Sequence, residues 1–462
     1  MASVLPQDVE KAPGELYMHE RFSIGAGKPF PPPLPDAKHY VVEFDGIDDP
    51  MHPYNWKISI KLYISIMVCT GTLVVSFTSA VFAPAIDSAS KAFGVGSEVG
   101  KLGTSLYVLG FACGPLIWAP ASELRGRKWP LTIGMLGGGI FTIGSAVAKD
   151  IQTLIICRFF AGTFGASQLT VVPAVLADVF DNTYRGVAIS LYALTVFIGP
   201  FSAPFIGGFI ASSYLGWRWT LYIPAILSLV LGALCVVFLK ETYAPCLLIV
   251  KAAAIRRQTH NWGVHAKQEE VEVNFRDLLN KYFTRPLKML ITEPILLLVS
   301  LYMSFIYGLV YALLEAYPYV FEQIHGMRPG VSGLTFFGLV IGQVLACTLI
   351  VSQHGIYARK LADNKNVPVP EWRLSPTLLG APAFTIGLFW AASAVAANII
   401  LRSAVAAGFP LFSTQMFENM GVQWAGTLLG CLAAIMMPIP LAFRTYGPWL
   451  RTKSKIFQQL VL

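Results

Sequence analysis

Charged residues are scarce in this chain of 462 residues: 13% are Asp, Glu, Lys or Arg, about half the share found in an average soluble domain. The seven cysteines form no CxxC pair and give no indication of a disulfide framework or a metal site. Neither GxxxxGKS nor GxxxxGKT occurs, so the sequence does not predict an ATP-driven protein. The apolar segments hold no cluster of His, Asp and Glu at catalytic spacing, so we do not expect an enzyme.

Long hydrophobic runs are abundant, and 55% of the residues are hydrophobic. A helix that crosses a membrane needs roughly 20 mostly apolar residues. The sequence therefore predicts an all-α polytopic membrane protein with about ten spans, at 61–83, 103–123, 129–148, 152–177, 187–212, 219–239, 290–313, 331–353, 377–412 and 425–443.

The basic residues indicate membrane topology and not nucleic-acid binding, although the net charge is +8. They lie between the apolar runs, and loops rich in Lys and Arg stay in the cytosol. With a cytosolic N-terminus, 27 of the 34 basic residues fall on the inner side, five on the outer side and two, Arg158 and Arg402, within apolar runs. An even number of spans then returns the basic C-terminus to the cytosol.

The hydropathy pattern divides the chain into five parts. Residues 1–56 are polar and proline-rich and are predicted to form a disordered cytosolic tail. A bundle of six helices is expected at 57–239, a charged cytosolic linker at 240–288 and a second bundle at 289–443. A short cytosolic tail is expected at 444–462.

The loop between the second and third predicted spans carries a carboxylate, a glycine turn and cations. Its residues run from Gly114 through Glu123 and Gly126 to Arg127 and Lys128. Charge pairs at helix ends can hold neighbouring helices in one of two conformations. The simpler interpretation is an ordinary basic loop on the cytosolic side.

Arg158 lies inside the fourth predicted span. A charged residue in a span is costly, so its usual interpretation is functional. The alternative is that its long side chain reaches the membrane interface, which is only a few residues away.

The fifth predicted span contains a run of glycines and prolines: Gly199, Pro200, Pro204, Gly207 and Gly208. Prolines bend a helix, and glycines let neighbouring helices approach closely. Without further context this pattern is ordinary membrane-helix packing.

In the second half, Glu315 stands at the end of an apolar run that also holds Tyr307 and Tyr311. In a partly dry cavity the pKa of this carboxyl group would rise, which would allow Glu315 to exchange protons. The alternative is an outer-surface glutamate. Both tyrosines could offer aromatic faces to a substrate.

Together these motifs resemble the major facilitator superfamily, in its fungal branch of drug:proton antiporters, continuously over about residues 55–245. The resemblance implies two helical bundles with 12 spans, against about ten here. It assigns Arg158 a part in proton coupling and gives the glycine–proline run the role of the antiporter motif, with Ala203 in place of one glycine. It also implies conformational locking by the Gly114–Lys128 loop and by Asp178 and Arg185.

The same resemblance implies a proton-coupled exporter of drugs, toxins or secondary metabolites that works by alternating access. It would be driven by the proton gradient with no cofactor. We expect a monomer in the lipid bilayer of the plasma membrane, or of the vacuolar membrane, without a nucleic-acid partner. A polyamine exporter is the alternative within the branch, although Glu315 is the single candidate for the several carboxylates that polyamines require.

The second half departs from the family pattern. Residues 370–382 are similar to the start of the ninth helix, and residues 396–412, with the cavity candidates Asn398 and Arg402, are similar to the eleventh. The two are joined directly near 389–394, so that about two helices are missing. As one helix, 377–412 would be about 54 Å long, against a hydrocarbon core of about 30 Å. A third possibility is therefore a remnant that does not transport.

Overall fold

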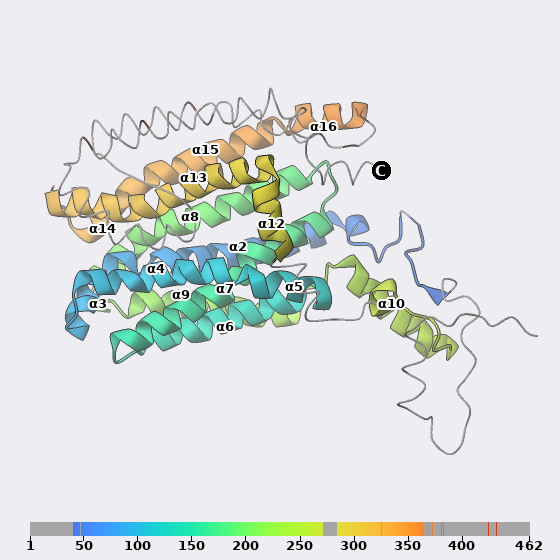
Figure 1. Cartoon of the computed structure of the whole chain (residues 1–462), viewed down its shortest axis with the longest axis horizontal. Coiled ribbons are helices and arrows are strands. Elements are labelled where there is room, and N and C mark those ends of the chain that lie inside the picture. Colours follow the sequence, from blue (N-terminus) through green and yellow to red (C-terminus); the bar gives the residue numbers. More distant parts are fainter. Residues whose placement is uncertain are drawn as a thin grey trace, which may run out of the picture.

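The computed structural model describes residues 40–46, 48–270, 284–324 and 326–364, together with a few single residues up to 431. Within this part the chain is helical, apart from one isolated bridge between Val41 and His265. Nearly parallel helices make up most of it (Figure 1).

A first group of helices forms one bundle that contains the Arg158 region. Its members are α2 (Ile58–Ala80), α3 (Ile86–Phe93), α4 (Ser97–Cys113), α5 (Pro115–Arg125), α6 (Lys128–Ala146), α7 (Ile151–Val179), α8 (Arg185–Ser212) and α9 (Trp219–Phe238). These agree closely with the six spans predicted for this half. One span, 103–123, is divided into α4 and α5 at the Gly114–Pro115 step.

Local sequence explains several of the helix boundaries. Asp150 caps α7, because its Oδ1 accepts a hydrogen bond of 2.8 Å from the backbone N–H of Thr153. α3 ends at Gly94, whose φ of +66° suits a residue without a Cβ atom. Proline residues stand inside α5, α7, α8 and α9, where neighbouring helices in a membrane bundle tolerate them.

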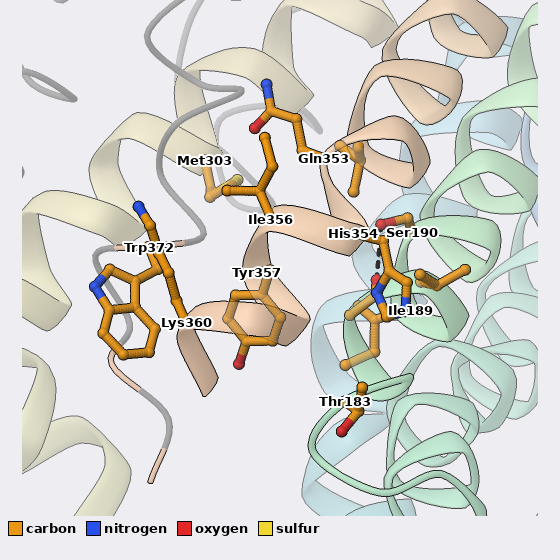
Figure 2. A pocket seen from close by; sticks show the side chains of 13 residues that line it. Thr183, Ile189, Ser190, Met303, Gln353, His354, Ile356, Tyr357, Lys360 and Trp372 are labelled. Carbon is orange, nitrogen blue, oxygen red and sulfur yellow. Dashed lines mark hydrogen bonds between the residues drawn. The ribbon is translucent and has the colours of Figure 1, made fainter. Parts of the chain in front are cut away.

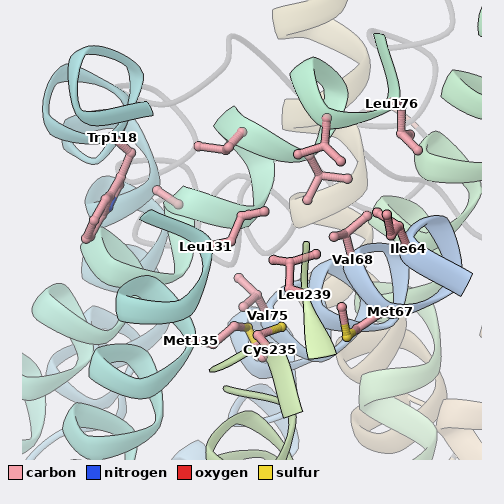
Figure 3. Packing of buried hydrophobic residues seen from close by; sticks show 14 of the residues in the cluster. Ile64, Met67, Val68, Val75, Trp118, Leu131, Met135, Leu176, Cys235 and Leu239 are labelled. Atoms are coloured by element: carbon pink, nitrogen blue, oxygen red, sulfur yellow. The ribbon is translucent and has the colours of Figure 1, made fainter. Parts of the chain in front are cut away.

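The core of this bundle is apolar and closely packed (Figure 3). Ile64 and Val68 of α2 lie in one cluster with Leu131 and Met135 of α6 and Leu176 of α7, and all five are buried. Burial of these side chains fixes the helices in place through dispersion contacts, because the lipid surroundings offer little hydrophobic driving force.

A second group of helices packs against α8 of the first group (Figure 1). It consists of α12 (Arg285–Thr292), α13 (Pro294–Pro318), a π-helical stretch (Tyr319–Ile324), α14 (Pro329–Ser332), the 3₁₀ turn η7 (Gly333–Phe336), α15 (Phe337–Ser352) and α16 (His354–Asp363). α13 and α15 correspond to the predicted spans 290–313 and 331–353. The predicted spans 377–412 and 425–443 lie outside the described residues.

Seven helices of the described part are long and apolar enough to cross a membrane. α6 is not one of them, because glycines and threonines lower its hydropathy. Figure 1 shows α3 and α14 at one end of the helices and α10 (Ala244–Thr259) and α16 at the other. We call these the α14 end and the α10 end.

Residues 40–46 and 48–56 take a defined conformation, and the first part of this segment contacts α10, whereas the sequence predicts disorder up to residue 56. Lys251 of α10 contacts Asp45 at 2.8 Å and Asp49 at 3.1 Å. Two backbone N–H groups, of Asp45 and Met51, lower the pKa of Asp49 and so favour its charged form. Val42 is buried beside Ala252 and Ala266. Composition alone did not reveal these tertiary contacts.

Candidate transport site

Arg158 is completely buried in the first bundle, one third of the way along α7. Its guanidinium group donates three hydrogen bonds to backbone carbonyls: to Gly103 at 2.9 Å, to Thr78 at 2.9 Å and to Ser79 at 3.2 Å. The face of the Tyr107 ring lies 4.4 Å from the guanidinium carbon. The side chain therefore points inward and does not reach the membrane interface.

The partners of Arg158 explain how the bundle accommodates a buried cation. Thr78 and Ser79 belong to the last turn of α2, whose carbonyls have no partner within the helix and carry the negative end of its dipole. No salt bridge to Arg158 occurs in the described part of the chain. A buried charge balanced by carbonyls and by the rings of Tyr107 and Phe82, without a carboxylate partner among the described residues, is costly, which favours a functional role for Arg158.

The loop between α5 and α6 lies at the α10 end and forms the ion pair that the sequence suggests. Arg127 Nε donates to Asp178 Oδ2 at 2.9 Å, and Arg127 Nη1 donates to Ser122 Oγ at 3.0 Å. Arg127 therefore connects the end of α7 with the end of α5. Gln268 Nε2 donates to the backbone carbonyl of Glu123 at 2.7 Å, which ties the linker to the same loop.

Glu241, which the sequence analysis did not single out as a site residue, holds this loop. Its carboxylate accepts hydrogen bonds from the backbone N–H groups of Arg127 at 2.8 Å and Lys128 at 3.1 Å. It also accepts from the N–H groups of Thr242 and Tyr243, both at 2.9 Å. The charge of Glu241 thus joins the α5–α6 turn to the chain that follows α9.

Two glycines of this loop occupy tight positions. Gly126 has a φ of +86°, and a Cβ atom there would overlap the Glu241 carboxylate. Gly114 lies against α7, where a Cβ atom would overlap that of Ala166. Gly126 therefore leaves room for the Glu241 carboxylate, whereas Gly114 permits close packing of α4 on α7.

Arg185 lies at the start of α8 and binds residues of other elements at the α10 end. Its Nη2 donates to Tyr54 Oη at 2.9 Å and to the carbonyl of Ala177 at 3.3 Å. Arg185 thus links α8, the end of α7 and the ordered segment before α2. It does not join Arg127 and Asp178 in one ion pair.

The glycine–proline run of α8 packs against the end of α2. A Cβ atom on Gly199 would lie 2.7 Å from the Phe77 nitrogen, and one on Gly207 would lie 2.6 Å from the Val81 carbonyl oxygen. Pro200 and Pro204 are buried within the helix. The carbonyl of Gly208 accepts a hydrogen bond from Ser212 Oγ at 2.7 Å.

The opposite side of the same run faces the second group of helices. A Cβ atom on Gly333 would lie 2.6 Å from Phe205 Cα, and the rings of Phe205 and Phe337 are 5.1 Å apart. α8 is thus packed between α2 and the start of α15. At the α14 end the two groups of helices are in close contact.

Tyr307 and Tyr311 of α13 are buried in that contact and line neither of the two cavities described below. Tyr311 Oη lies 2.9 Å from Ser79 Oγ and 3.5 Å from Tyr307 Oη. Glu315 follows Tyr311 in α13, and its side chain lies outside the described residues. Asn398 and Arg402 also lie outside them.

Two cavities of about 450 and 440 Å³ lie towards the α10 end. The first is bounded by the start of α8 on one side and by α13, α15 and α16 on the other. Figure 2 shows Thr183 and Ser190 on one side with His354 next to Ser190, and Tyr357, Lys360 and Trp372 farther across. The second cavity lies between α2 and α8 and is lined mainly by apolar side chains, such as Leu62 and Leu191. Both have the size of a site for a small molecule.

The described lining of both cavities contains no Asp or Glu. Lys360 and His354 supply the basic groups of the first, and Tyr357 and Trp372 supply aromatic surface. The sequence did not identify these residues, because the cavity joins segments about 170 positions apart. Such a lining suits neutral or anionic amphipathic compounds.

Comparison with known proteins identifies the family. A family model described as "Major Facilitator Superfamily" matches residues 68–442, which is well over half of the chain. The chain belongs to the major facilitator superfamily. It is a transporter and a multi-pass membrane protein, and members of this family bind small molecules and couple to ion gradients.

Several curated fungal relatives are named multidrug transporters. This chain is 40% identical to the "Multidrug transporter TPO1_2" of Candida glabrata, with 94% of this chain and 82% of the relative covered. It is also 40% identical to "Major facilitator superfamily multidrug transporter FLU1" of Candida albicans (94% and 78% covered). A third relative, at 40% identity, is the "Ascochitine biosynthesis cluster MFS transporter" of Didymella fabae (92% and 91% covered). These relatives confirm the predicted family branch and the transport role, and the family match together with the helical structure of the described residues confirms the all-α fold class.

The alignment with the Candida glabrata relative contains gaps in this chain. It runs over 477 positions but takes in 94% of the 462 residues, about 434. About 43 aligned positions therefore have no counterpart here. That number is enough for two spans of roughly 20 residues each, which agrees with the two helices missing from the family pattern.

Proposed function

We propose that the chain exports small amphipathic compounds in exchange for protons by alternating access. The observation that carries this proposal is Arg158, a fully buried cation bound by three carbonyls of α2 and α4. The relatives named as multidrug transporters support the substrate class. The bundles at 57–239 and 289–443 would rock about a central site.

The proton would not be carried by Arg158 itself, because a guanidinium group stays charged throughout the physiological pH range. Arg158 instead supplies a fixed positive charge beside α2, and a carboxyl group nearby would exchange the proton. Glu315 is our candidate, because it follows the buried Tyr311 by one helical turn in α13. Deprotonated Glu315 would be attracted to the Arg158 region, and protonated Glu315 would be released from it.

The closed α14 end and the cavities near the α10 end support a conformation that receives substrate from the α10 side. We propose that this side faces the cytosol, because the basic loops lie there, and that the membrane is the plasma or vacuolar membrane. The proton gradient would be the energy source, with no cofactor, in a monomer. The part of the cavity linings that the structure describes holds no carboxylate, which favours neutral or anionic substrates over polyamines.

Arg158→Ala and Arg158→Lys test the proposal in cells that export a fluorescent amphipathic dye. We expect both variants to reach the membrane and to lose dye efflux, because the compact ammonium group of Lys cannot reproduce the planar guanidinium geometry that reaches three separate carbonyls. Arg257→Ala removes an exposed arginine of α10 and is the matched control. Wild-type rates in Arg158→Ala would contradict the proposed role.

The roughly 43 unmatched positions favour a second candidate, in which this version of the chain does not transport. Sequencing of the transcript and expression of both forms would separate the two. A transcript that contains about two further helices after residue 389, and an active longer protein, would make the longer form the exporter. Efflux by the present chain would exclude the inactive remnant.

A further inference from the structure

Ser79 connects the two groups of helices at the α14 end. Its Oγ atom lies 2.9 Å from Tyr311 Oη, across the boundary between α2 and α13. Ser79 has no exposed surface, and 4% of Tyr311 is exposed. The hydrogen bond between them is therefore shielded from water.

The hydrogen bonds around Ser79 fix which hydroxyl group donates. Ser79 Oγ donates its single proton to the carbonyl of Ser76 at 2.7 Å. Tyr311 must therefore donate to Ser79. The carbonyl of Ser79 accepts from Arg158 Nη2 at 3.2 Å, so that one residue links Arg158 to the second group of helices.

Apolar side chains of both groups surround this bond. Phe77 of α2 and Val81, which directly follows α2, lie in one buried cluster with Leu314 and Ala316 of α13 and with Phe336. Apolar contacts adapt when helices slide, whereas a directed hydrogen bond breaks when its partners separate. Any movement that opens the α14 end between α2 and α13 must therefore break the bond from Tyr311 to Ser79.

We propose that Tyr311 is a gating residue whose hydroxyl group holds the α14 end closed by donating to Ser79. Through the Ser79 carbonyl, the same contact ties opening of that end to the position of Arg158. The role of this contact in transport rests on the proposed alternating-access function. The contact itself can be tested in the absence of substrate and of a proton gradient.

The test measures how often the α14 end opens in the purified full chain in lipid nanodiscs. Ala316→Cys places a thiol at a position that is 2% exposed in the closed contact. Its rate of reaction with a maleimide, followed at that peptide by mass spectrometry, reports opening. Loss of one buried hydrogen bond should raise the rate about fivefold in Tyr311→Phe and in Ser79→Ala.

A double variant separates the gate from two independent effects. If each change removes the same hydrogen bond, the double variant Ser79→Ala with Tyr311→Phe should also react about fivefold faster than wild type. Tyr317→Phe makes the same chemical change in α13, at a hydroxyl for which the described structure shows no hydrogen bond, and should stay within twofold. Ala225→Cys, buried within the first bundle, should react at an unchanged rate in every variant.

An unchanged rate in Tyr311→Phe would overturn the gate. An equal rise at Ala225→Cys would also overturn it, because it would indicate general loosening. A rise of about 25-fold in the double variant would contradict a shared bond. If the variants show the fivefold rise but the wild-type chain shows no proton-driven efflux, the gating role of Tyr311 would stand and the proposed function would be contradicted.

Discussion

Replacement of Glu241 tests whether the α5–α6 loop is locked as the structure indicates. The carboxylate accepts hydrogen bonds from four backbone N–H groups at 2.8–3.1 Å. Two of these groups, those of Arg127 and Lys128, belong to the α5–α6 loop, and the other two directly follow Glu241 in the chain. Glu241→Ala removes both acceptor oxygens and with them all four hydrogen bonds, while water can satisfy part of the loss because Glu241 is half-buried. At about 1.5–2 kcal/mol for each of the two bonds from Arg127 and Lys128 to this charged group, the local free energy of opening should fall by about 3–4 kcal/mol.

Glu241→Gln should have a smaller effect. Oε1 accepts three of the four hydrogen bonds, and the amide oxygen of Gln can take its place and accept the same three. Oε2 accepts the fourth, from Lys128 N, and is replaced by an NH₂ group that cannot accept it. We expect a loss of about 1 kcal/mol for this variant. The two variants therefore separate the effect of the whole carboxylate from that of one oxygen.

Hydrogen exchange of the backbone amides at 126–130 measures this local opening directly. Exchange should become at least a hundredfold faster in Glu241→Ala and several-fold faster in Glu241→Gln. Glu98→Ala removes an exposed carboxylate at the α14 end and serves as the control. Exchange within twofold of wild type in Glu241→Ala would show that the Glu241 carboxylate does not hold the α5–α6 loop.

Two further predictions concern packing and substrate choice. Gly207→Ala places a Cβ atom 2.6 Å from the Val81 carbonyl oxygen, so it should lower the free energy of unfolding by about 2 kcal/mol and abolish efflux. Gly338→Ala is the control for both measurements, because a Cβ atom at Gly338 would have no atom within 4 Å. Unchanged melting and efflux in Gly207→Ala would contradict the close packing of α8 on α2. Lys360→Ala should raise the KM for an anionic amphipathic dye about threefold and leave that for a neutral dye unchanged. An equal change for both dyes would exclude a role for the Lys360 charge.

The sequence predicted the helices well, because each span is a continuous apolar run that hydropathy detects. The span at 219–239, for example, is α9 (Trp219–Phe238). The break at Gly114–Pro115 was missed, because apolar residues continue across it. Arg158 was identifiable as a charge within a span, but its three carbonyl partners follow only from the fold.

Contacts over long sequence separations could not be predicted. Glu241 meets Arg127 across 114 positions, and Tyr311 meets Ser79 across 232. Nothing in the sequence around Glu241 indicated a carboxylate that binds the turn after α5. The cavity beside Lys360 likewise depends on the packing of α8 against α15 and α16.

Proton-driven transport by the purified chain in sealed proteoliposomes tests the central claim most directly. With a pH gradient imposed and no ATP present, the chain should move a fluorescent amphipathic dye against its concentration gradient. Movement should stop when an ionophore collapses the pH gradient, and it should be absent in Arg158→Ala. Dye movement that persists without the pH gradient, or that requires ATP, would contradict proton coupling.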